Sequence, residues 1–410
     1  MRHENKALAS VLLLVCVSYI GVALPYPILA PLFIGATPAK LADFMRLPPE
    51  LLLGLVLAAY PLGMFLGGHV LGALADHLGR KPVIRWTQIG VCLSYLLSGY
   101  ALLQQQYLLL LFSRLLTGLF EGNIAIARSI AADLSHAIPK TTSFSYIHAA
   151  VYIGYLIGPL LGGALLYHSA STPFYFAAAL ALVGLGYFER MFQETHSRTT
   201  DAPVVTKFNA WILLRRRTVR QLCLINTLSA LAFSTFYQFY PLYLVKIYDF
   251  GSDGIALLTG VLTVSLIFSS LVMVKVGKKY LSLAANIIWS LTFYGLLGSA
   301  MMLVNNHFAF YVLFTLLGLF IVTSGTNMGV YVSDHTPADE QGKLMGLLAS
   351  LSAIGTVLSI LLGSFLATFS PYYPMIGSVL FAAVALLLFM RLHLQNDVAP
   401  SDLISTAKHS

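Results

Sequence analysis

Charged side chains are scarce in this sequence. Asp, Glu, Lys and Arg make up 10% of its 410 residues, whereas hydrophobic residues make up 58%. Water-soluble globular proteins typically carry about 25% charged residues. The composition therefore excludes an ordinary soluble domain and predicts a chain that lies mostly within a lipid bilayer.

Cysteines are few, and residue sets typical of catalytic sites are not apparent. The three cysteines, Cys16, Cys92 and Cys223, fall inside apolar stretches and lack the spacing of a metal or redox site. The apolar stretches show no catalytic set at one depth, such as Ser with His, paired Asp or His-rich metal spacing. We therefore expect no enzyme activity, no cofactor and no metal.

Apolar stretches of about 20 residues recur along the chain, and each is long enough to cross a bilayer. They predict an all-α membrane protein with twelve transmembrane helices. The longest polar interval divides these helices into two sets of six. The predicted parts are an N-terminal bundle (1–193), a cytoplasmic linker (194–217), a C-terminal bundle (218–395) and a cytoplasmic tail (396–410).

Basic residues orient the chain. The formal net charge is +8, and most Lys and Arg residues fall in the segments that face inward if both termini are cytoplasmic. This is the positive-inside pattern of membrane proteins. Because these residues lie at membrane edges and not in one patch, we expect no nucleic-acid partner.

The two halves repeat one another. Ile153–Gly162 matches Ile354–Gly363 at a displacement of 201 positions, and Gly118-Leu119-Phe120 matches Gly318-Leu319-Phe320 at 200. Several matches in order at nearly one displacement indicate an internal duplication. The two six-helix bundles are therefore expected to be pseudo-symmetric.

Glycine is concentrated in one apolar stretch, Ser143–Tyr167. Small residues let two membrane helices pack closely, and a proline removes one helical hydrogen bond and bends the helix. The pattern GxxxGPxxGG resembles a motif of the drug:proton antiporters of the major facilitator superfamily. The resemblance implies a substrate site near the bilayer midplane and rocking of the two halves. The residues expected to act in gating here are Gly154, Gly158, Pro159, Gly162 and Gly163.

A second motif follows the second predicted span and reads Gly72-Ala-Leu-Ala-Asp76-His-Leu-Gly79-Arg80-Lys81-Pro82. It resembles the family's cytoplasmic loop motif, which implies a latch that holds one state of the rocking cycle. Asp76, Gly79, Arg80 and Lys81 are the expected gating residues. The alternative is a plain turn that carries positive-inside charges.

The fourth predicted span, Tyr107–Ser129, carries the most unusual charges in the chain. Arg114, Gly118, Glu121, Ala125 and Arg128 are spaced to share one face of a continuous helix. Arg114-Leu-Leu-Thr-Gly118 resembles the family's fourth-helix motif. A charge at membrane depth is costly unless it faces a cavity or a partner, so it points to function.

Glu121 is the candidate proton carrier and Arg114 its neighbour in coupling. At a displacement of 200, these positions correspond to the uncharged Phe314 and Ile321, so the shared scaffold does not require the charges. The alternative is a structural Arg114–Glu121 ion pair. His148 is a further candidate for proton transfer, with a packing role as its alternative.

The first predicted span, Leu8–Ala30, has no acidic residue, although some relatives of this type place one there. It ends in Leu24-Pro25-Tyr26-Pro27-Ile28-Leu29-Ala30-Pro31, which resembles the family's proline-rich first-helix motif. Prolines can break the helix where it lines a cavity. The seventh span, expected opposite, is rich in aromatic side chains, which suit bulky apolar or cationic ligands.

Six residues are therefore the substrate-binding candidates. An aromatic belt at the outer interface remains the alternative for the seventh span, and packing hydrogen bonds remain the alternative for the polar residue of the tenth span. The candidates are Tyr26, Arg114, Glu121, Tyr237, Gln238 and Asn327.

The resemblance implies proton-coupled export of small amphiphilic drugs or metabolites across a bacterial inner membrane by alternating access. Its expected partners are a small-molecule substrate, protons and the lipid bilayer, and the expected state is a monomer. Two alternatives stay open. One is uptake or facilitated transport of a metabolite or siderophore by the same fold, and the other is a non-transporting membrane sensor.

Overall fold

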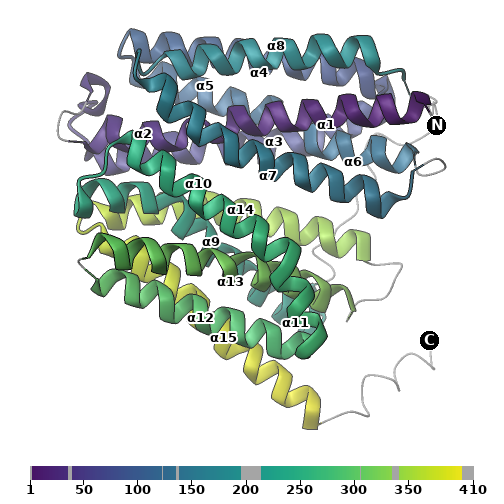
Figure 1. Ribbon diagram of the computed structural model, residues 1–410, viewed down its shortest axis with the longest axis vertical. Coiled ribbons are helices and arrows are strands. Elements are labelled where there is room, and N and C mark those ends of the chain that lie inside the picture. The colour runs from purple at the N-terminus through teal and green to yellow at the C-terminus, as the bar shows by residue number, and fades with distance from the viewer. Residues whose placement is uncertain are drawn as a thin grey trace. The chain divides into compact units, whose positions relative to one another are not determined.

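A computed structural model describes residues 2–35, 39–121, 123–134, 138–194, 214–304, 306–334 and 341–398. Within these ranges the regular elements are all helical (Figure 1). The helices of the first half are α1 (Arg2–Ala23), α2 (Tyr26–Ile34), η1 (Lys40–Ala42), α3 (Pro49–Leu78), α4 (Arg80–Leu103), α5 (Tyr107–Phe120), α6 (Asn123–Asp133), α7 (Lys140–Leu166) and α8 (Thr172–Met191). Those of the second half are α9 (Arg217–Tyr248), α10 (Ser252–Phe268), η4 (Ser269–Met273), α11 (Val274–Tyr280), α12 (Leu283–Leu303), α13 (His307–Asp334), α14 (Gln341–Ala367) and α15 (Tyr372–Val398).

Eleven helical segments of the described chain are long and apolar enough to cross a membrane. The first of them, Glu4–Ile34, joins α1 and α2. The predicted fourth span is the exception, because α5 is a shorter apolar helix that is followed by the separate helix α6. The predicted spans are thus present, with the fourth divided in two.

The continuous helix predicted over Tyr107–Ser129 is wrong. Helix α5 ends at Phe120, and Glu121 has φ −84° and ψ 68°, which is not helical. Its N–H still bonds the Gly118 carbonyl at 3.1 Å, which closes the last turn. The next residue in the sequence is glycine, which weakens a helix by about 1 kcal/mol relative to alanine. The single charged face predicted from Arg114 to Arg128 is therefore interrupted.

The glycines of α7 give the close helix packing that the sequence predicts, and the structure identifies α1 as the partner (Figure 1). A Cβ added at Gly154 would lie 2.5 Å from Tyr19 Cβ, and one at Gly158 would lie 2.7 Å from the Ile20 carbonyl oxygen. A Cβ at Gly162 would collide with the Leu24 carbonyl oxygen. These three positions therefore need glycine because backbone lies directly against backbone.

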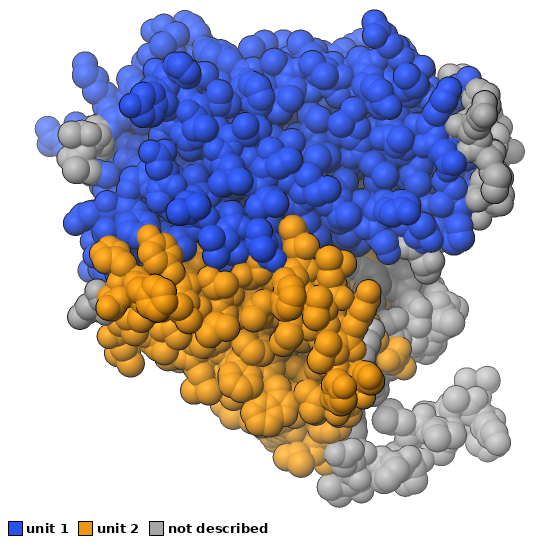
Figure 2. Space-filling model, in the orientation of Figure 1, with its two compact units in different colours: residues 1–208, 237–264, 356–373 blue, residues 209–236, 265–355, 374–410 orange. Residues whose placement is uncertain are grey.

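The chain forms two compact units (Figure 2). The first contains residues 1–208, 237–264 and 356–373, and the second contains residues 209–236, 265–355 and 374–410. The first unit thus combines the first-half helices with parts of α9, α10 and α14. The sequence-based division at 194–217 stays a prediction, since residues 195–213 lie outside the described chain.

Contacts within the first unit explain why it contains segments from both halves of the sequence. Glu50 at the start of α3 forms an ion pair with Lys246 of α9, with 3.1 Å between Oε1 and Nζ. A Cβ at Gly163 of α7 would lie 2.7 Å from the Cβ of Ala256 on α10. Segments from both sequence halves therefore pack together inside one unit.

Candidate functional site

A break in the first span positions Tyr26. Helix α1 ends at Ala23 and α2 begins at Tyr26, with Pro25 between them. Proline has no N–H to donate, so the α-helical ladder cannot continue through this position. The carbonyl oxygen of Pro25 instead accepts from Ile28 and Leu29, at 3.0 and 3.1 Å, and starts the new helix. The predicted proline break is confirmed, and Tyr26 opens α2 at that point.

The break lines a cavity of about 170 Å³ that lies wholly within the first unit. Its apolar wall includes Val22, Leu29 and Leu57. Its polar lining comes from α2, α3, α5, α7, α9 and α14 and consists of Tyr26, Tyr60, Arg114, Tyr155, Gln238 and Thr356.

Three of the six predicted substrate-binding residues lie in this lining, namely Tyr26, Arg114 and Gln238. Tyr237 packs behind it, with ring centroids 4.9 Å from Tyr26 and 6.2 Å from Tyr155 in edge-on contacts. The first and seventh spans thus meet at this point, as the sequence analysis expects.

Arg114 is the charged residue of the lining. Arg114 is 5% exposed to solvent, and its Nε and Nη1 atoms have no hydrogen-bond partner among the described residues. Its Cζ lies 5.2 Å from the centre of the Tyr60 ring, within the range of a cation–π contact. Gly118, one turn further along α5, touches the backbone of Tyr60, so the close approach of α3 and α5 places the guanidinium beside this ring.

Glu121 is 7% exposed and directly follows α5. It is not in the cavity lining, but it is close enough to Tyr19, Tyr60 and Tyr95 to act on them electrostatically. Arg114 forms no ion pair with Glu121 or with any other residue that the structure describes. The alternative of a static Arg114–Glu121 pair is therefore not seen here.

The remaining membrane candidates lie elsewhere. His148 is exposed on α7 and is close enough to Arg128 for an electrostatic effect. Asn327 is fully buried on α13 in the second unit, and neither atom of its amide has a hydrogen-bond partner in the described chain. A separate cavity of about 200 Å³ lies in that unit and is lined in part by Asn226, Tyr294 and Ser324.

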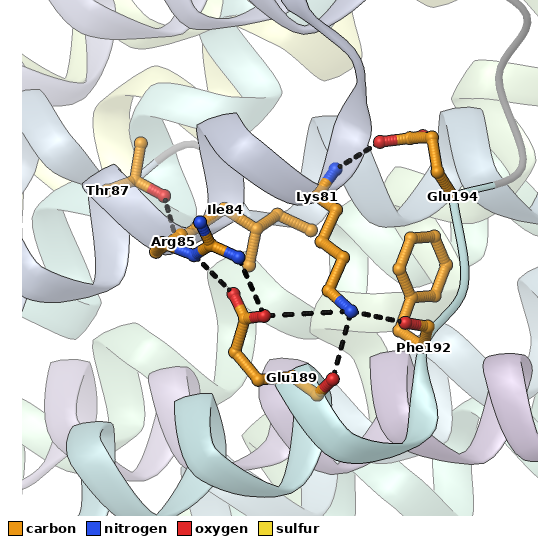
Figure 3. Close-up of polar contacts among 7 residues, drawn as sticks. All are labelled: Lys81, Ile84, Arg85, Thr87, Glu189, Phe192 and Glu194. Carbon is orange, nitrogen blue, oxygen red and sulfur yellow. Dashed lines mark hydrogen bonds and ion pairs between the residues drawn. The ribbon is translucent and has the colours of Figure 1, made fainter.

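The loop motif forms a charge cluster at the turn from α3 to α4 (Figure 3). Gly79 has φ +97°, a backbone conformation that residues with a Cβ rarely adopt. The Glu194 carboxylate then accepts hydrogen bonds from the backbone N–H groups of Arg80 and Lys81, at 3.1 and 2.9 Å. A carboxylate at this position satisfies two free donors and complements the positive end of the helix.

Side chains of the same cluster hold the end of α8. Lys81 Nζ donates to the carbonyl oxygens of Glu189 and Phe192, at 2.9 and 2.7 Å. Arg85 donates two hydrogen bonds to the Glu189 carboxylate, at 2.7 and 2.9 Å (Figure 3). Arg80 Nε donates to Asp133 at 3.4 Å. The motif therefore ties α4 to the ends of α6 and α8.

Sequence reasoning missed the acidic partners of this cluster. Glu194 is the first residue of the long polar interval and Glu189 lies five positions before it. Acidic residues close to so many basic ones are the signal that could have identified them. The side chain of Asp76, the fourth predicted gating residue of this motif, lies outside the described residues.

Comparison with known proteins supports the resemblance. The sequence profile of the Major Facilitator Superfamily matches residues 11–285 and 222–408 of this chain. The class H tetracycline resistance protein of Pasteurella multocida is 26% identical over 98% of this chain and 100% of its own length. The quinolone resistance protein NorA of Staphylococcus aureus is 26% identical over 92% of this chain and 94% of its own length.

Solved structures agree on the fold. The human organic anion transporter MFSD10 aligns with a TM-score of 0.70 at 18% identity, covering 94% of this chain and 99% of its own. The nucleoside transporter NupG aligns with a TM-score of 0.73 at 12% identity over the whole of both chains. At these identities the likeness shows the fold alone. With its helices, its repeat and this family match, the chain belongs to the major facilitator superfamily of membrane transporters.

Proposed function

We propose that this transporter exports small amphiphilic compounds, drugs or metabolites, from the bacterial cytoplasm in exchange for protons. The observation that carries the proposal is the cavity in which Arg114 meets tyrosines and aliphatic side chains, buried and without an ion-pair partner among the described residues. Such a lining offers apolar contact together with a few directional polar groups, as small-molecule sites do. Two relatives that match along most of their length are named for resistance to tetracyclines or quinolones, which favours export.

Glu121 is the proposed proton carrier. It is almost fully buried at membrane depth, and the repeat places no acid at the matching position of the second half. Because Arg114 does not bond to it, Glu121 can gain or lose a proton without breaking an ion pair with that residue. His148 remains a secondary candidate for proton transfer.

The proposed cycle separates the contacts that join the two sequence halves within the first unit. The Glu50–Lys246 pair joins the first turn of α3 to the last turn of α9, at helix ends that the charge pattern places outside, so it closes the outer side. Gly163, near the C-terminal end of α7, forms a second close contact on this side, with α10. Gly154, Gly158, Pro159 and Gly162 keep α7 attached to α1 during the motion, and the cluster at Gly79, Arg80 and Lys81, together with Asp76, holds the inner end.

Inside-out membrane vesicles with an acidic interior test this proposal. A pH-sensitive dye reports proton release when drugs or metabolites are added. Export predicts substrate-triggered release in the wild type and none in Glu121→Gln. Asp249→Asn removes an exposed acid away from the cavity and is the matched control.

Either of two results would contradict the proposal. Unchanged gradient-dependent transport in Glu121→Gln would remove the proton-carrier role. Absence of release in the wild type, with insertion and gradient verified, would favour uptake or uniport of a metabolite, for which the polar side of the cavity lining also has suitable groups.

A further inference from the structure

We infer that the cavity binds substrates through an anionic group, and that its substrates are small amphiphilic organic anions. The inference rests on the proposed function, because it names the substrate class of the same site. It differs from the cationic or uncharged ligands that the aromatic sequence pattern suggests.

Arg114 provides the first argument. A guanidinium stays charged at all physiological pH values and carries five N–H donors and no acceptor. Here it is 5% exposed, and both Nε and Nη1 lack a partner in the described chain. A buried charge normally has a hydrogen-bonding partner of opposite sign. A carboxylate, sulfonate or phosphate on the ligand supplies that partner.

The rest of the lining provides the second argument. The other polar groups are the hydroxyls of Tyr26, Tyr60, Tyr155 and Thr356 and the amide of Gln238. All of them can donate hydrogen bonds to an anion, and none carries a negative charge that would attract a cation. Glu121 lies outside the lining and is not paired with Arg114. A ligand in this cavity therefore meets a positive charge.

The aromatic rings provide the third argument. Cations bind to the faces of aromatic rings, but the Tyr60 ring already has Arg114 at 5.2 Å. The Tyr26 ring is engaged by Tyr237 in an edge-on contact at 4.9 Å. The rings thus serve as apolar wall, together with Val22, Leu29 and Leu57, for the body of an amphiphile.

Three naphthalene probes of matched size separate the charge classes. These are 2-naphthoate, 2-naphthylmethylammonium and the neutral 2-naphthalenemethanol, each titrated into the purified full-length protein in nanodiscs. We expect 2-naphthoate to bind about ten-fold more tightly than either of the others. This ranking in the wild type needs no variant, so it stays decisive even if a substitution prevents folding.

Variants then assign the preference to one residue. Arg114→Gln should abolish the preference for 2-naphthoate, and Arg114→Lys should keep most of it because the charge remains. Arg190→Gln removes an exposed arginine of α8 and should leave the preference unchanged. A preference that survives Arg114→Gln in a folded protein would overturn the inference.

The same titrations distinguish organic from inorganic anions. Binding of chloride without any preference among the three probes would overturn the inference, because the guanidinium would then hold an inorganic ion. Failure here is separable from failure of the proposed export. Proton release that is triggered by cations or neutral drugs alone would support export and contradict the anion site. Binding of 2-naphthoate without proton movement would support the anion site and contradict proton-coupled export.

Discussion

The guanidinium of Arg114 lies over the ring of Tyr60, with 5.2 Å between Cζ and the ring centre. The two residues belong to α5 and α3, whose backbones meet at Gly118. The contact therefore depends on helix packing as well as on the two side chains. It places the guanidinium, which is the charged group that the described residues contribute to the cavity lining, against an aromatic ring.

Removing this ring should weaken substrate binding. Tyr60→Leu removes a cation–π contact that is worth about 1 kcal/mol and that holds the guanidinium in place before substrate binds. Substrate binding must then order Arg114, so the apparent affinity should fall by up to about five-fold. Tyr60→Phe keeps the ring face and loses only the hydroxyl, so its affinity should fall less than that of Tyr60→Leu. The half-saturating concentration in the vesicle assay measures both, and equal behaviour of the two variants would argue against a role for the ring face.

Glu121→Gln should separate exchange from coupling. Without a titratable carboxyl, the protein should no longer accumulate substrate against its gradient, yet it should still exchange labelled for unlabelled substrate. Counterflow in proteoliposomes without a pH gradient measures the exchange. Loss of exchange as well, in a protein that elutes as a single folded species, would assign Glu121 to binding or folding and not to proton transfer.

A methyl group at Gly158 should destabilise the protein. The added Cβ would lie 2.7 Å from the Ile20 carbonyl oxygen, so backbone must move. Overpacking of this kind costs about 1–3 kcal/mol. Gly186→Ala is the matched control, because a Cβ there meets nothing within 4 Å. Thermal unfolding in detergent should show a lower Tm for Gly158→Ala only, and an unchanged Tm would mean that α1 and α7 adjust easily.

The carboxylate of Glu194 should protect the backbone amides at the start of α4 from hydrogen exchange. Glu194→Ala leaves the N–H groups of Arg80 and Lys81 without this acceptor, and the loss of such a cap costs about 0.5–2 kcal/mol. Amide hydrogen exchange of the segment 80–84 should accelerate. Glu194→Gln keeps one acceptor oxygen and should give an intermediate rate, so a rate equal to the wild type in both variants would refute the cap.

The Glu50–Lys246 pair should favour the closed outer side. It is partly exposed, so its contribution is about 0.2–1 kcal/mol and the change in transport rate is about five-fold at most. Lys246→Glu places two carboxylates together and should change the rate, and the exchanged pair Glu50→Lys with Lys246→Glu should restore it. No rescue in the double variant would show that the charges act separately.

The sequence predicts most of this fold because apolar length and glycine spacing are local signals. The break at Pro25 and the stripe from Gly154 to Gly162 follow from residue type alone. The end of α5 at Phe120 was not predicted, since the apolar run continues through this point and a single glycine often stays within a helix.

The site is less predictable than the fold. Tyr60, Tyr155 and Thr356 were missed because a tyrosine or threonine in an apolar helix looks the same whether it packs or lines a cavity. Glu194 was missed because it caps a helix that begins 114 positions earlier in the chain. Both relationships arise only from the packing of distant segments.

Two adjacent glycines of α7 face in different directions. Gly162 lies against the Leu24 backbone of the first span, and Gly163 lies against Ala256 of α10. At Gly163 the backbone of α7 is open to the side chain of Ala256, whereas one turn earlier the Leu160 side chain of α7 packs over Gly260 of α10. Thr263 of α10 donates a hydrogen bond to the Tyr155 carbonyl oxygen of α7 at 3.4 Å, so movement of α10 along α7 has to break this bond as well as weak dispersion contacts. One face of α7 is thus fixed by backbone packing, and the other face is held by a few separable contacts.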